Sequence, residues 1–176
     1  MRKKTKQIYA ESLLVLLKKS SYNVITISEI CDNTSLSRRT FYNNFNTKDD
    51  VVRFICENMM TQYIDILRKE DNLTLIKVAT IFCRYGESML DVFKLLIQNN
   101  IYHIFIDTGI KNISIIHDLI PNNILSKVNE TQRKYTFLVH SVGAFKMFEQ
   151  WIISGMKESS EELASIYASI IRDVQC

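Results

Sequence analysis

Residues 38–43, R-R-T-F-Y-N, are the part of this sequence whose side chains most clearly suggest a chemistry. An arginine can donate paired hydrogen bonds to a guanine edge or to a phosphate, and an asparagine can pair with adenine. Hydroxyl groups, such as those of Thr40 and Tyr42, can bind phosphates without reading the base sequence. Phe41 and Phe45 are four residues apart and share the inner face of a helix, which leaves the polar groups outside. These residue types predict binding to DNA, although a solvated helical hairpin with a charged face has the same pattern.

Three predicted helix starts position this run. Thr26 is followed three residues later by Glu29, a capping box that opens a short helix. Residues 33–36 are too polar and too short to continue that helix, and they indicate a turn. Ser37 caps the next helix, and Thr47 caps a third. Two short helices joined by a tight turn, with arginines at the start of the second, are typical of a helix-turn-helix.

The same stretch resembles the DNA-binding motif of the TetR/AcrR family of bacterial transcription regulators. The core R-x-T-F-Y-x-x-F occurs at residues 38–45, the element K-D/E-D/E at residues 48–50, and the opening T-[IV]-x-[DE]-I at residues 26–30. The form I-T-I-S-E-I-C, with Cys31 where alanine is usual, is similar to a subgroup common in Gram-positive bacteria. Ser35 replaces the usual turn glycine, so we expect the turn to differ locally.

This resemblance implies an all-α fold with a helix-turn-helix head at residues 1–50 and a helical body at residues 51–176. The body would dimerise and bind a small effector. The protein would be a ligand-responsive transcription regulator, and we expect a repressor rather than an activator. Together with the residue chemistry, it gives a set of expected DNA contacts. These are Arg38, Arg39 and Asn43 for bases or phosphates, and Thr26, Ser37, Thr40, Tyr42 and Lys48 for the DNA backbone.

Composition and charge agree with this interpretation. Four glycines and one proline in 176 residues favour long helices. Residues 1–53 contain ten Lys or Arg and five Asp or Glu, whereas the remainder contains twelve and fourteen, so the positive charge lies in the predicted head. The four cysteines form no C-x-x-C pair, and we find no signal peptide and no long uncharged apolar run. We therefore expect a cytoplasmic protein that does not enter a membrane.

Periodicity and break residues predict the remaining elements. The expected helices span residues 8–19, 48–69, 74–85, 87–98 and 130–154, and a last helix follows a capping box formed by Ser159 and Glu162. Gly86 is expected to separate two of them, and Gly155 to cap the fifth. The basic segment 1–6 would either add phosphate contacts or be a solvated terminus.

Residues 101–129 are open to two interpretations. Their β-branched residues could form a strand, whereas the resemblance favours short helices and loops, with a break at Thr108–Gly109. The pattern W-I-x-x-G at residues 151–155, followed by S-x-E-E-L-A at residues 159–164, is similar to the C-terminal half of the same regulator subgroup.

The family places a small apolar or aromatic ligand among its middle helices and builds its dimer from the last two. The expected pocket residues are Phe82, Tyr85, Met89, Phe93, Tyr102, His103, Phe105 and Trp151. The expected interface residues are Tyr135, Leu138, Val142, Phe145, Leu163, Ile166, Tyr167 and Ile170. The alternative interpretation, for both sets, is that these residues pack in the hydrophobic core of a single chain. A homodimer would match a palindromic double-stranded operator.

Other functions receive less support from the residues. The chain has no nucleophile motif, no glycine-rich phosphate loop and no metal-ligand spacing, so we expect neither an enzyme nor a cofactor nor a metal. Redox sensing through Cys31 requires a reactive thiol. The main alternative is an activator or co-regulator whose body binds a partner protein instead of a small molecule. A purely structural helical dimer remains a further alternative.

Overall fold

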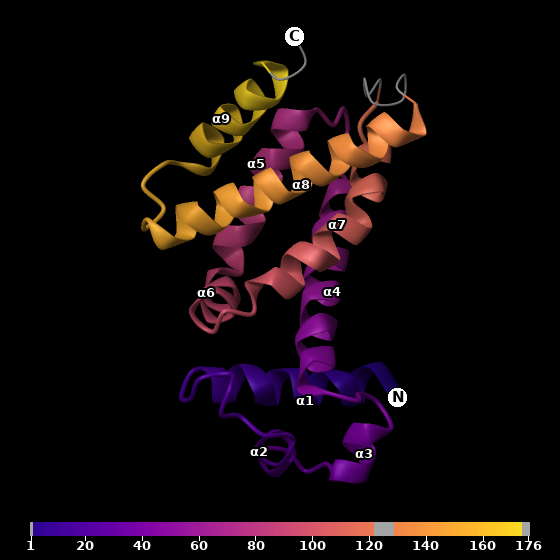
Figure 1. The fold of residues 1–176 in the computed structure, drawn as a ribbon, viewed down its shortest axis with the longest axis vertical. Coiled ribbons are helices and arrows are strands. Elements are labelled where there is room, and N and C mark those ends of the chain that lie inside the picture. Colours follow the sequence, from indigo (N-terminus) through magenta and orange to yellow (C-terminus); the bar gives the residue numbers. More distant parts are fainter. Residues whose placement is uncertain (1, 122–128, 174–176) are drawn as a thin grey trace. The chain divides into compact units, whose positions relative to one another are not determined.

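The computed structural model describes residues 2–121 and 129–173, and within them all regular structure is helical (Figure 1). The helices are α1 (Arg2–Leu17), α2 (Ile27–Asp32), α3 (Arg38–Tyr42), α4 (Lys48–Leu67), α5 (Leu75–Ser88), α6 (Leu90–Gln98), α7 (Tyr102–Asp118), α8 (Glu130–Ile153) and α9 (Ser160–Asp173). The all-α prediction is therefore confirmed. None of these helices is long and apolar enough to cross a membrane.

The chain forms two compact units. The head unit comprises Met1–Met59 and Asp91–Phe105, and the body unit comprises Met60–Leu90 and Ile106–Cys176. The head unit thus includes a segment far along the chain that carries most of α6 and the start of α7. The functional boundary predicted at residue 50 remains a prediction.

The head unit is built on α1, with α2 and α3 together on one side of it (Figure 1). Leu13 of α1, Ile30 of α2 and Phe41 of α3 are completely buried. The Ser12 hydroxyl donates a 2.8 Å hydrogen bond to the Ile30 carbonyl, which satisfies a polar group inside this core. The apolar faces predicted for these helices therefore meet in one core.

The body unit has an aromatic core in which α5 packs on α8. The ring of Phe82 lies 4.7 Å from that of Phe148 and 5.6 Å from that of Phe145, measured between centroids. Gly86 lies against Phe148, because a Cβ at Gly86 would be 2.2 Å from the ring. The expectation that Gly86 separates two helices is wrong. It lies inside α5, where its missing side chain lets α8 approach, and the break comes at Met89.

The strand alternative for residues 102–118 is also wrong, because this segment is the single helix α7. The break expected at Thr108–Gly109 does not occur. Gly109 lies within the helix, and a Cβ there would be 2.2 Å from the ring of Phe145. Gly86 and Gly109 therefore allow their helices to pack closely against α8, and neither of them ends a helix. The remainder of the predicted segment, residues 122–128, lies outside the described residues.

Local end signals predicted for α8 and α9 are confirmed. Gly155 has φ +89° directly after the C-cap Ser154, and the next amide donates 2.8 Å back to the Trp151 carbonyl, as in a Schellman cap. The Ser159 amide donates to Glu162, and the Glu162 amide donates to the Ser159 hydroxyl, which completes the capping box of α9.

Candidate nucleic-acid interface

Helix α3, which the sequence predicts to be the recognition helix, begins at the predicted cap. The Ser37 hydroxyl accepts a 3.1 Å hydrogen bond from the Thr40 amide, and the two hydroxyls of this pair lie 3.0 Å apart. The Ser37 carbonyl accepts a 2.9 Å bond from the Tyr9 hydroxyl on α1. The start of α3 is thus fixed both by its own cap and by another helix.

Aromatic side chains hold the inner face of α3. Phe41 and Phe45 are buried, with ring centroids 5.7 Å apart. Tyr9 meets Phe41 edge to face at 5.2 Å, and Phe54 of α4 meets Phe45 at 5.9 Å. This packing determines the rotation of α3, and so decides which of its side chains face solvent.

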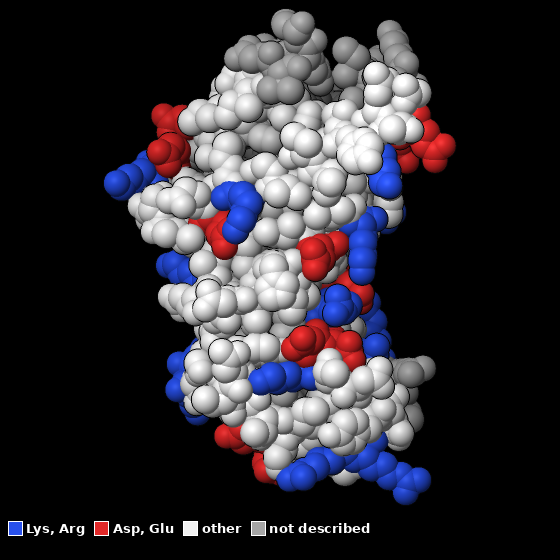
Figure 2. All heavy atoms as spheres, viewed as in Figure 1, with Lys and Arg blue, Asp and Glu red and all other residues white. Residues whose placement is uncertain are grey.

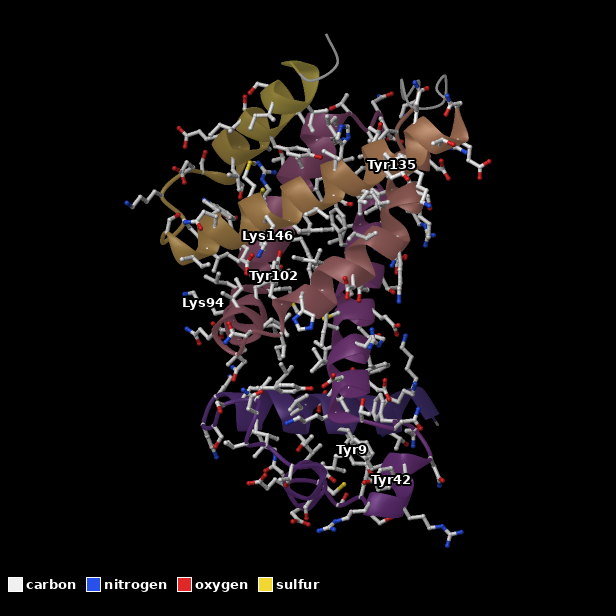
Figure 3. The ribbon with its side chains drawn as sticks, in the orientation of Figure 1. Tyr9, Tyr42, Lys94, Tyr102, Tyr135 and Lys146 are labelled. Atoms are coloured by element: carbon white, nitrogen blue, oxygen red, sulfur yellow. The ribbon has the colours of Figure 1, made fainter. Side chains whose placement is uncertain are left out.

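The outer face carries the predicted DNA-reading groups. Arg38, Arg39, Tyr42 and Asn43 are exposed, and Thr40 is half-buried. Figure 2 shows Lys and Arg side chains at the edge where α2 and α3 lie, and Figure 3 shows Tyr42 on α3 at the same edge. The Arg38 guanidinium donates to the Ser28 hydroxyl on α2, so it links the two helices of the motif. This face can present cationic and hydroxyl donors to phosphates and base edges.

Two other predicted contacts have local partners. The Thr26 hydroxyl accepts from the Glu29 amide at 3.2 Å and donates to the Glu29 carboxylate at 2.8 Å, which confirms the capping box. The Thr26 backbone N–H also donates to this carboxylate at 2.7 Å, and this bond, followed by the one from the hydroxyl, lowers the pKa of the Glu29 carboxyl. The Lys48 ammonium donates to the carbonyls of Tyr22 at 2.6 Å and Ile25 at 2.9 Å. A phosphate contact by Thr26 or Lys48 would have to share or replace these bonds, and both remain predictions.

The turn between α2 and α3 avoids the expected strain. Ser35 is not among the described non-glycine residues with positive φ, so the turn does not need the left-handed conformation that glycine favours. Thr34 shapes it instead. Its hydroxyl donates 2.8 Å to the Cys31 carbonyl and accepts 3.0 Å from the Leu36 amide. Sequence reasoning missed Thr34, although a threonine in a polar turn is a known side-chain turn signal.

The basic N-terminal segment is helical, because α1 begins at Arg2 and not near Ile8 as predicted. The Lys6 ammonium lies 5.1 Å from the centroid of Phe45 and 5.6 Å from that of Phe54. A cation over aromatic faces is attracted by their quadrupole. Lys6 therefore has a packing role, while Lys3 and Lys4 are exposed.

The Cys31 thiol is buried in the head unit, and burial raises its pKa. A thiol with a raised pKa holds little thiolate, which is the reactive form. The geometry therefore gives no support to redox sensing at this position.

The body unit contains a cavity of about 80 Å³ between α4, α5, α7, α8 and α9. Its walls are mainly apolar, and the polar groups among them belong to Tyr63, Cys83, His117, Ser141 and Tyr167. None of its lining residues is Lys, Arg, Asp or Glu. Burial and the neighbouring His140 lower the pKa of His117 to about 4, so this imidazole is neutral near pH 7. The cavity suits an uncharged apolar occupant better than an ionised one.

The predicted pocket residues do not gather around this cavity. Only Phe82 of that set lines it. Phe93, Tyr102 and Phe105 instead form an aromatic cluster inside the head unit, with Phe93 and Phe105 centroids 4.9 Å apart. Trp151 closes the end of α8, where its indole donates 2.9 Å to the Glu158 carbonyl. The remaining members, Tyr85, Met89 and His103, are also absent from the cavity wall.

The predicted interface residues divide into two groups. Tyr135, Leu138 and Val142 on α8, and Ile166 and Ile170 on α9, are exposed apolar side chains, and Figure 3 shows Tyr135 near the start of α8. Phe145, Leu163 and Tyr167 lie instead on the cavity wall, because they point toward the helices that surround it. The exposed group defines the apolar face of α8 and α9.

Within the described parts of the chain, no three or more His, Cys, Asp or Glu side chains are grouped in a way that could hold a metal ion. The geometry as a whole defines a helix-turn-helix unit whose reading helix presents basic and hydroxyl groups, together with a helical unit that contains a cavity.

Comparison with known proteins agrees with a helix-turn-helix protein. No profile of a known protein family matches the chain. The HTH-type dhaKLM operon transcriptional activator DhaS of Lactococcus lactis subsp. lactis (strain IL1403) is 25% identical over 130 residues, 74% of this chain. The chain spans 63% of the length of that relative.

Two solved structures share the fold over nearly the whole chain. A TetR transcriptional regulator from Streptococcus agalactiae 2603V superposes with a TM-score of 0.64 at 16% identity, covering 97% of this chain and 94% of that one. A dihydroxyacetone kinase operon activator, DhaS, superposes with a TM-score of 0.61 at 19% identity, covering 96% and 94%. The chain therefore has the fold of the TetR-family transcriptional regulators, and the resemblance drawn from residues 26–50 is confirmed.

Proposed function

We propose that this protein is a transcriptional regulator that binds a palindromic DNA operator as a homodimer and responds to a small effector. The main support is the orientation of α3. Phe41, buried together with Phe45 just beyond the helix, turns the inner face of α3 toward the core, and this leaves Arg39 and Tyr42 exposed on the outer face. A regulator of this kind would act in the cytoplasm, where its operator is.

The test is a titration of the purified protein against its own upstream intergenic DNA at several salt concentrations. Saturable binding of two chains to one palindromic segment, with log affinity falling linearly with log salt, is the expected result. Weak binding that is equal on all sequences would contradict the proposal.

The direction of regulation has two candidates. The family resemblance favours repression, whereas the matched Lactococcus lactis relative is named as an activator, which supports activation. Transcription in vitro from a promoter that carries the operator distinguishes them. Less transcript on adding the protein indicates a repressor, and more transcript indicates an activator.

The apolar face of α8 and α9 supports the homodimer. Leu138 on α8 is 43% exposed, and Ile166 and Ile170, four residues apart on α9, are 44% and 48% exposed; exposed apolar side chains that share a helix face are typical of an interface. In a two-fold dimer the same face of each subunit would meet its copy. Ile166→Glu should convert the dimer to a monomer in sedimentation velocity, whereas Ile76→Glu, at an isoleucine of similar exposure on α5, should not.

The cavity of the body unit supports an uncharged apolar or aromatic effector. Thermal shift assays should compare ligands of similar size and shape that differ in charge, for example benzamide and benzoate. Stabilisation by the uncharged members alone is expected, since the walls contain no charged side chain. A partner protein that binds the body unit with no small-molecule requirement would favour the co-regulator alternative.

A further inference from the structure

A side-chain amide at the end of α6 holds the segment that leads into the helix-turn-helix. The Asn99 amide oxygen accepts a 2.8 Å hydrogen bond from the backbone N–H of Tyr22, across 77 residues of sequence. Tyr22 lies in the connector, residues 18–25, between α1 and the cap of α2. Both partners belong to the head unit.

The end of α6 fixes the position of Asn99. Asn100 has φ +58°, its amide donates 3.0 Å to the Ile97 carbonyl, and the Ile101 amide donates 2.9 Å to the Leu96 carbonyl. This pattern is a Schellman cap with Asn100 in the left-handed position, and it makes Asn99 the C-cap residue. The backbone of Asn99 is therefore held by the helix end itself.

The two hydrogen bonds of Asn99 also determine which way its amide points. Its nitrogen donates 2.9 Å to the Leu95 carbonyl, which can only accept, and its oxygen accepts from the Tyr22 N–H, which can only donate. The reverse orientation would lose both bonds. Asn99 thus joins α6 to the connector in one defined geometry.

The start of α4 holds the same connector. The Tyr22 hydroxyl donates to Asp49, and the Lys48 ammonium lies 4.4 Å from the centre of the Tyr22 ring while bonding the carbonyls of Tyr22 and Ile25. Ile25 directly precedes Thr26, the cap of α2. Tyr22 is 7% exposed, so these contacts lie in a mostly buried setting.

We propose that Asn99 is a positioning residue for DNA recognition, in that its amide fixes the connector and thereby the placement of α2 and α3 against the start of α4. This inference rests on the proposed function for its DNA readout. The residue touches no DNA itself and acts through Tyr22.

The test uses the full-length protein and two substitutions, of which one removes the hydrogen bond to Tyr22 and the other keeps it. Asn99→Leu removes the bonds to Tyr22 and to the Leu95 carbonyl, and it keeps the branched shape of the side chain. Asn99→Asp keeps an acceptor for the Tyr22 N–H, but it places a carboxylate beside the Leu95 carbonyl at a helix C-terminus, where negative charge is unfavourable. The matched control is Asn112→Leu. Asn112 makes the same local bond, 2.8 Å to the carbonyl of Thr108 four residues before it, in α7.

Asn99→Leu should speed hydrogen exchange at the Tyr22 amide by about five- to tenfold and weaken operator affinity by a similar factor. This factor corresponds to the net free energy of about one hydrogen bond. Asn99→Asp should lower the melting temperature yet keep most of the operator affinity, a pattern that a purely structural role would not give. Asn112→Leu should change neither Tyr22 exchange nor operator affinity.

Unchanged Tyr22 exchange in Asn99→Leu would overturn the inference, as would faster exchange with unaltered operator affinity. If the wild-type protein binds no specific DNA, the proposed function fails and the DNA role of Asn99 fails with it. The exchange measurement then still reports whether Asn99 holds the connector.

Discussion

The hydroxyl of Tyr9 on α1 donates a hydrogen bond to the carbonyl of Ser37, the residue that caps α3. Tyr9 is completely buried, and Figure 3 shows it between α1 and the layer formed by α2 and α3. The first helix of the chain therefore fixes the point at which the recognition helix starts.

Removing this hydroxyl should destabilise the protein. Tyr9→Phe keeps the ring but leaves the Ser37 carbonyl with only the Phe41 amide as a donor. We expect a loss of about 1 kcal/mol in the free energy of unfolding, measured with urea. Tyr42→Phe is the control. Its ring is 56% exposed, so stability should not change, and an equal loss in both variants would contradict this role for Tyr9.

Arg39 is expected to read sequence, and Tyr42 to bind the DNA backbone. Within residues 2–121 and 129–173 the Arg39 side chain makes no hydrogen bond or ion pair, so it is available to a base edge. Arg39→Ala should cost about 1–3 kcal/mol on the operator and much less on unrelated DNA, whereas Tyr42→Phe should weaken both alike. Competition titrations with operator and scrambled DNA measure the two effects. Equal weakening on both DNAs by Arg39→Ala would remove its base-reading role.

Gly86 should not tolerate a methyl group. A Cβ there would lie 2.2 Å from the Phe148 ring, which is buried and cannot move freely. We expect Gly86→Ala to destabilise the protein by about 1–3 kcal/mol. In Gly143→Ala on α8 the new Cβ would meet nothing within 4 Å, so this control should stabilise the helix by about 0.5–1 kcal/mol. Urea unfolding of both variants should give changes of opposite sign.

The described thiols should be inert in the folded protein. Burial raises the pKa of Cys56 and of Cys83 to about 12, and it also raises the pKa of Cys31. In a Cys176→Ser background at pH 8, a thiol reagent such as DTNB should react slowly with the native protein and quickly after unfolding in urea. Rapid modification of native Cys31 would restore redox sensing as a candidate.

Acid should weaken the body unit through His117. Its folded pKa of about 4 lies below the ordinary 6.5, so between these values the unfolded chain binds a proton that the folded chain does not. Stability is therefore lost as the pH falls from 6.5 toward 4, by up to about 1.4 kcal/mol per pH unit for this group. Urea unfolding at pH 6.5 and 4.5 should show a smaller acid loss in His117→Gln than in the wild type. His103→Gln, at an exposed histidine, should match the wild type.

Helices α2 and α3 and the turn between them were predictable from sequence because their signals are local. The capping box of Thr26 and Glu29, the cap at Ser37 and the inner pair of Phe41 and Phe45 each depend on residues within four positions. The composition, with few glycines and one proline, favoured long helices, and the resemblance to the TetR/AcrR family implied the all-α fold that is observed.

The residues that line the cavity of the body unit were not predictable, because aromatic residues at helical spacing do not reveal which neighbour they face. Phe93 and Phe105 were expected beside Phe82, but they pack in the head unit, whereas Phe82 lines the cavity of the body unit. Phe145 has the helical spacing that predicted an interface residue, but in the structure it is buried against Gly109.

The sequence by itself determined where α2, α3, α4, α8 and α9 start. Backbone hydrogen bonds at a helix end are satisfied by near neighbours, so short-range patterns encode them. The tertiary structure decided that Gly86 and Gly109 pack against rings instead of ending helices, and that Asn99 reaches Tyr22. These contacts join residues far apart in the chain, and their free energy depends on which helix faces meet.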